Sequence, residues 1–134
     1  MNHQRIERIA LALIGLFMLP AGLQAAFAPQ SFFEDFPLGR SWISHHGDQY
    51  NEHLVRDVGA LILAFIIVTG WTVCKQRPGR SIAVAWLAQG VLHLVYHSGH
   101  LDGYGSADKI GLVGSLVTVP VLAGLALWAG RSST

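Results

Sequence analysis

Charged side chains are scarce in this chain. Only 13% of its 134 residues are charged, whereas a soluble domain carries about 25%. At the same time, 51% of the residues are hydrophobic and the mean hydropathy is +0.42. The deficit of charge therefore predicts a membrane protein rather than a soluble domain.

Other absences exclude several classes of function. The single cysteine, Cys74, rules out an intramolecular disulfide, a CxxC redox pair, a cysteine-rich zinc site and CxxCH haem attachment. The net charge is +1 and no run of Lys and Arg is present, so no nucleic-acid partner is expected. The sequence also has no Walker loop, GxSxG elbow or HExxH motif. These patterns leave open whether the chain is an enzyme.

Four apolar segments account for most of the chain. Residues 9–28, 54–74 and 110–129 can each cross a bilayer, which takes roughly 17–25 residues. The segment that begins at residue 81 is interrupted by Gln89 and His93, and it is long enough only if it continues to residue 101. No segment has the alternating pattern of an outer-membrane barrel. The expected fold is all-α, a four-helix transmembrane bundle forming a single membrane domain over residues 1–134, with helices at 9–28, 54–74, 81–101 and 110–129 and an outer loop at 29–53.

The first segment has two interpretations. Arg5 and Arg8 precede an apolar run that ends in Ala26, Phe27 and Ala28, which resembles a signal peptide with an A-x-A cleavage site. Pro29 would then follow the cut, where signal peptidases tolerate proline poorly. We therefore expect the segment to be retained as a helix.

The distribution of Lys and Arg predicts the orientation of the chain. Positive charges lie near the N-terminus, between the second and third segments and near the C-terminus, at Arg5, Arg8, Lys75, Arg77, Arg80 and Arg131. Residues 29–53 instead carry four carboxylates and only one cation, Arg40. Both termini are therefore expected to be cytoplasmic in a bacterial inner membrane. The loop at 29–53 and six of the seven histidines would face the extracytoplasmic side.

Three histidines share one face of the third segment. His93, His97 and His100 are spaced i, i+4 and i+7. At about 100° per residue, this spacing places them within roughly a 60° sector of the helix. Ionisable groups at membrane depth are costly and usually mark a functional site. The histidine stripe therefore predicts where a site lies, near the outer surface.

Polar residues at the start of the second segment are the expected partners of the stripe. Glu52 and Arg56 are spaced i, i+4, as are His53 and Asp57, so each pair can interact along the helix. The short connection between the second and third segments makes these helices neighbours. This polar cluster would then meet the histidine stripe. Supporting polar contacts are expected from Arg56, Gln89, Tyr96 and Ser115.

Three kinds of chemistry fit such a pocket. Neutral imidazoles at i, i+4 together with carboxylates suit a transition metal such as zinc, iron or copper. The predicted ligands are His53, His93, His97, His100, Glu52 and Asp57. The same groups could instead form a structural hydrogen-bond network, or a pocket that relays protons or binds a quinone. We expect a metal or redox cofactor. The alternatives are a non-catalytic accessory subunit of a membrane complex and, third, a proton-coupled carrier.

Three sequence runs carry a resemblance to a known group. They are AFAPQSFFEDFP, NEHLVRDVGAL at the start of the second segment and HLVYHSGHL at the end of the third. These runs resemble small bacterial four-helix membrane proteins that are similar in layout to the DoxX-like superfamily. The resemblance implies an inner-membrane bundle. DoxX-like members are linked to quinone-coupled oxidoreductase complexes, but no motif here carries that role over. The expected partners are the lipid bilayer and a membrane protein or second copy of the chain.

Overall fold

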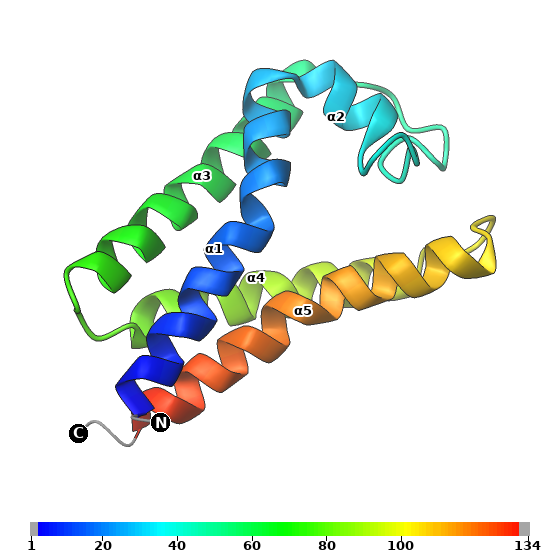
Figure 1. The fold of residues 1–134 in the computed structure, drawn as a ribbon. Helices are drawn as coiled ribbons and strands as arrows, with labels where there is room; N and C mark the ends of the chain where they lie inside the picture. Colours follow the sequence, from blue (N-terminus) through cyan, green and yellow to red (C-terminus); the bar gives the residue numbers. More distant parts are fainter. Residues whose placement is uncertain (1–2, 132–134) are drawn as a thin grey trace. The chain divides into compact units, whose positions relative to one another are not determined.

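The structure is a computed structural model that describes residues 3–131. These residues form five helices and no strand, and the helices are α1 (His3–Phe27), α2 (Pro29–Asp35), α3 (Glu52–Cys74), α4 (Arg80–Ser98) and α5 (Ser106–Gly130) (Figure 1). The chain divides into two compact units. We name them the terminal unit, Met1–Ile14 with Thr69–Thr134, and the central unit, Gly15–Val68.

The expected four-helix transmembrane bundle is wrong. The described residues form five helices, and three of them, α1, α3 and α5, are long and apolar enough to cross a membrane. Helix α4 has only 19 residues and ends at Ser98 instead of residue 101. Gln89 and His93 also lower its hydropathy. The expectation that both termini are cytoplasmic was drawn from that four-helix bundle and is not kept.

The core of the terminal unit forms around Trp86. This side chain of α4 is 0% exposed, and its Nε1–H donates a hydrogen bond to Thr69 Oγ1 of α3 at 2.8 Å. Leu11 and Ile14 of α1 are also fully buried. Because the indole N–H has a partner, burying this large side chain leaves no polar group unsatisfied.

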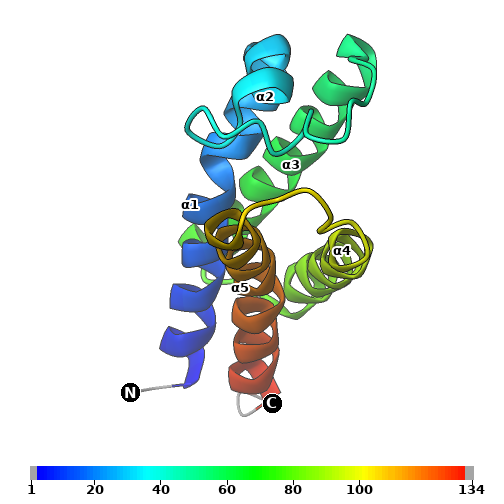
Figure 2. The same cartoon turned by 90° about the vertical axis from the view of Figure 1, so that its right-hand side faces the viewer.

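Helix α4 packs against α5 at a glycine and a proline. A Cβ atom added to Gly90 would lie 2.8 Å from Cδ of Pro120, which is inside α5. Only glycine leaves room for the proline ring at this distance. The connection at residues 99–105 turns the chain so that α4 and α5 lie side by side (Figure 2).

A buried carboxylate joins three segments at one end of the terminal unit. Glu7 is 7% exposed, and its Oε1 accepts a hydrogen bond from the Gly79 N–H at 2.8 Å. A Cβ added to Gly130 would lie 3.1 Å from the same oxygen. The ring of His3 packs on Trp128 with centroids 5.2 Å apart. The start of α1, the loop before α4 and the end of α5 therefore meet (Figure 1).

In the central unit, α1 and α3 approach closely through glycines. A Cβ added to Gly59 would lie 2.7 Å from the carbonyl carbon of Ala25 and 2.8 Å from Cα of Ala26, and one added to Gly22 would lie 2.8 Å from Cγ2 of Ile62. Small residues allow such contact between membrane helices. Directly after α1, Pro29 opens α2 at a position where a helix needs no N–H donor. The predicted outer loop thus begins with a short helix.

Candidate functional site

A pocket of about 480 Å³ lies in the central unit, between α2 and the start of α3. Small-molecule sites have volumes of about 300–1,000 Å³, so the pocket is large enough for a small ligand. Its lining residues are Ala28, Pro29, Gln30, Ser31, Glu34, Asp35, Tyr50, Glu52 and Arg56. Three of the nine are carboxylates and one is a cation, which makes the lining negative.

Helix α2 contributes two of these carboxylates at its last turn. Gln30 Nε2 donates to Glu34 Oε1 at 3.0 Å, and Ser31 Oγ donates to Asp35 Oδ2 at 3.1 Å. Both contacts span four residues and therefore follow from the helix itself. Within residues 3–131, no Lys, Arg or His forms an ion pair with Glu34 or Asp35. Their negative charge is therefore not neutralised by another described side chain.

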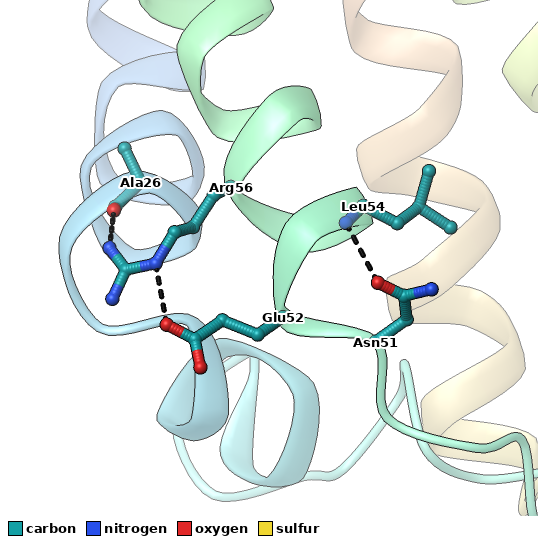
Figure 3. A network of polar contacts seen from close by, with 5 residues as sticks. All are labelled: Ala26, Asn51, Glu52, Leu54 and Arg56. Atoms are coloured by element: carbon teal, nitrogen blue, oxygen red, sulfur yellow. Dashed lines mark hydrogen bonds and ion pairs between the residues drawn. The ribbon is translucent and has the colours of Figure 1, made fainter.

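Arg56, the single cation of the lining, already contacts two other residues of the protein. Arg56 Nε donates to Glu52 Oε1 at 2.8 Å, and Arg56 Nη1 donates to the backbone oxygen of Ala26 at 2.7 Å (Figure 3). The first turn of α3 is held by a further contact, in which the Leu54 N–H donates to Asn51 Oδ1 at 3.1 Å. The guanidinium therefore fixes α3 to α1 and neutralises Glu52.

Tyr50 also lines the pocket. Its ring packs on Phe33 of α2 with centroids 5.5 Å apart. Desolvation, followed by the negative charge of Glu52, raises the pKa of the Tyr50 hydroxyl above its usual value. The hydroxyl is therefore protonated at neutral pH and can donate a hydrogen bond to a ligand.

The predicted pairing at the start of α3 is confirmed. Arg56 pairs with Glu52, and His53 Nε2 lies 3.3 Å from Asp57 Oδ2. His53 and Asp57 are both exposed and neither lines the pocket. Of the predicted site residues, Glu52 and Arg56 are the two that do.

Ring stacking links members of the histidine stripe to one another and to Tyr96. The rings of His93 and His97 stack with centroids 4.7 Å apart, and His100 stacks on Tyr96 at 4.3 Å. Gln89 Nε2 lies 3.2 Å from His93 Nδ1. These residues are all in the terminal unit, whereas His53 and Asp57 are in the central unit.

Ser115, the remaining predicted polar residue, is satisfied within its own helix. Its Oγ donates to the Leu112 carbonyl oxygen of α5 at 2.8 Å.

In the part of the chain that the structure describes, no group of three or more His, Cys, Asp or Glu side chains could hold a metal ion. The six-residue metal site stays a prediction.

Glu34, Asp35 and Tyr50 were not among the predicted site residues. Residues 29–53 were expected to form a loop, although a signal for α2 is present in the sequence. Pro29 suits the first position of a helix, and the polar pairs Gln30/Glu34 and Ser31/Asp35 have helical spacing.

Comparison with protein-family models, curated proteins and solved structures finds no match to this chain.

Proposed function

We propose that this chain is an integral membrane protein that binds a small organic dication, such as an aliphatic diamine, in the pocket between α2 and α3. One observation carries the proposal. Glu34 and Asp35 line the pocket without an ion-pair partner among the described residues, while its only cation, Arg56, is bound to Glu52 and Ala26. A ligand with two ammonium groups would neutralise both carboxylates.

Tyr50, whose ring packs on Phe33, adds to this preference. An ammonium group is attracted to the face of an aromatic ring within about 6 Å of its centroid, and Tyr50 lines the pocket with its ring against Phe33. The methylene chain of a diamine also suits a pocket that includes Ala28 and Pro29. The lining therefore offers both charge and apolar surface.

We place the pocket on the extracytoplasmic side of a bacterial inner membrane. The support is the charge of residues 29–53, which hold four carboxylates and only one cation, Arg40. Segments poor in Lys and Arg are typical of this side. A ligand supplied from outside the cell would then reach the pocket directly.

Titration of the detergent-purified protein with 1,4-diaminobutane tests the proposal. We expect binding of the diamine and none of 1,4-butanediol, which has similar length and no charge. Because ion pairs in exposed sites contribute about 0.2–1 kcal/mol, Glu34→Gln and Asp35→Asn should each weaken binding up to about fivefold. Calorimetry gives the affinities.

Asp57→Asn is the matched control for this titration. It removes a carboxylate of α3 that is paired with His53 and does not line the pocket, so diamine affinity should not change. Equal binding of diol and diamine, or an equal effect of Asp57→Asn and Asp35→Asn, contradicts the proposal. Binding in detergent but not from outside right-side-out vesicles contradicts only the placement of the pocket.

A metal centre is the second candidate, and one distance favours it. The 3.3 Å between His53 Nε2 and Asp57 Oδ2 is close to the roughly 3.4 Å edge of a tetrahedron with zinc bonds of 2.0–2.1 Å. Both side chains are exposed, so water can supply the other ligands. Zinc titration should show weak binding that His53→Ala abolishes and Glu34→Gln leaves unchanged. Zinc retained by His53→Ala but lost from His93→Ala/His97→Ala would assign the metal to the histidine stripe.

A further inference from the structure

Positive charge gathers at one end of the terminal unit. Six of the nine Lys and Arg residues lie at the start of α1, between the end of α3 and the first residue of α4, and after α5. These are Arg5, Arg8, Lys75, Arg77, Arg80 and Arg131, and we name them the basic end. The contacts of Glu7 with Gly79 and Gly130, and of His3 with Trp128, hold these three segments together.

The basic end has almost no compensating negative charge. Glu7 is the single carboxylate in residues 3–14, 69–80 and 124–131. It is buried, and its Oε1 accepts the Gly79 N–H; among the described residues it forms no ion pair. Arg5, Arg77 and Arg80 are exposed and likewise have no ion-pair partner within residues 3–131. Several positive charges are thus available to an external anion.

Two tryptophans indicate the depth of the basic end in a membrane. Trp71 and Trp128 lie near the ends of α3 and α5, both candidate spans, and their side chains are 61% and 53% exposed. Lys75 Nζ lies 5.6 Å from the centroid of the Trp71 ring. Exposed tryptophans near the ends of apolar helices are typical of the interface between hydrocarbon and head groups. The cations beside them therefore lie at the level of lipid phosphates.

We propose that the basic end binds the head groups of anionic phospholipids. Arginine guanidinium groups form paired hydrogen bonds with phosphate oxygens, and clusters of Lys and Arg beside membrane helices attract anionic lipids. Apolar helices and interfacial tryptophans hold the cations against the bilayer, which favours a lipid over a soluble anion. The proposal is independent of the pocket between α2 and α3.

Competition between two spin-labelled lipids tests this inference. The protein is reconstituted in bilayers that contain labelled phosphatidylglycerol or labelled phosphatidylcholine, and electron paramagnetic resonance measures the immobilised fraction of each. One cation near the surface corresponds to about a fivefold preference, so wild type should favour phosphatidylglycerol at least fivefold. In 1 M salt, where the Debye length is about 3 Å, the ratio should fall toward one.

Charge-removing variants show whether the basic end is responsible. Arg5→Gln/Arg77→Gln/Arg80→Gln should bring the ratio close to one. Arg40→Gln/Lys109→Gln removes cations outside the basic end and should leave it unchanged. The proposal is overturned by equal affinity of wild type for the two lipids, by an equal loss in both variants, or by loss of the preference when inorganic phosphate replaces chloride at constant ionic strength. The wild-type salt and phosphate measurements decide the question even if a variant does not fold.

Discussion

Replacing Trp86 by alanine is expected to lower the free energy of unfolding by about 3–5 kcal/mol, the range for removing a buried Trp or Phe side chain. Trp86 is 0% exposed, so its removal leaves a cavity that the surrounding helices can fill only in part. The change also leaves the Thr69 hydroxyl without its indole donor. Unfolding by SDS in mixed micelles, followed by far-ultraviolet circular dichroism, measures the loss.

Trp71→Ala is the matched control. It removes the same side chain from a position on α3 that is 61% exposed, so it creates no protein cavity. We expect the free energy of unfolding to change by less than about 1 kcal/mol.

Thr69→Val separates the effect of the hydrogen bond from that of packing. It keeps the side-chain volume but removes the acceptor of the Trp86 N–H, at a cost of about 1–3 kcal/mol. Equal effects of Trp86→Ala and Trp71→Ala would show that the core does not form around Trp86.

The apolar segments predicted the four longer helices and misjudged their ends. Helix α5 begins at Ser106, four residues before the predicted start, and α1 begins at His3 instead of residue 9. Backbone hydrogen bonds continue a helix through polar residues as easily as through apolar ones. Hydropathy therefore finds the part of a helix suited to lipid, not the whole helix. The same limit explains α4, which is helical although it is not among the candidate spans.

The candidate site was predictable only where its contacts are local. The pairs Glu52/Arg56 and His53/Asp57 depend only on the rise and twist of one helix, and both are present. Contacts between helices depend on how the helices pack, and the spacing of residues along the sequence does not reveal this packing. The hydrogen bond from Arg56 to Ala26 joins residues 30 positions apart, and no spacing rule indicates it.

The pocket could not be predicted from the sequence, because it too depends on contacts between helices. Its carboxylates Glu34 and Asp35 come from α2, which has seven residues and follows α1 after a single residue, Ala28. A short helix has little apolar periodicity, so residues 29–53 were expected to form an outer loop. The pocket forms because α2 follows α1 after Ala28 and the hydrogen bond from Arg56 to the Ala26 oxygen holds the start of α3 beside it.

Gly59→Ala is expected to destabilise the protein by about 1–3 kcal/mol, the usual cost of adding volume to a packed contact. The new Cβ would lie 2.7 Å from the carbonyl carbon of Ala25, and backbone atoms cannot rotate away as side chains do. Gly70→Ala, on the same helix, is the matched control because its Cβ would meet no atom within 4 Å. Alanine is the better helix former by about 1 kcal/mol, so this control should be neutral or stabilising. In the same SDS titration, Gly59→Ala should therefore lower the free energy of unfolding, whereas Gly70→Ala should not.

The Gly59 contact also supports the pocket. Arg56 lies one helical turn before Gly59 and donates to the Ala26 oxygen at 2.7 Å, so moving α3 away from α1 stretches this bond. A released guanidinium could then turn toward Glu34 and Asp35 and compete with a bound dication. Gly59→Ala should accordingly weaken diamine binding as well as folding, while Gly70→Ala affects neither. Loss of stability with unchanged diamine affinity would mean that the helix contact and the pocket are independent.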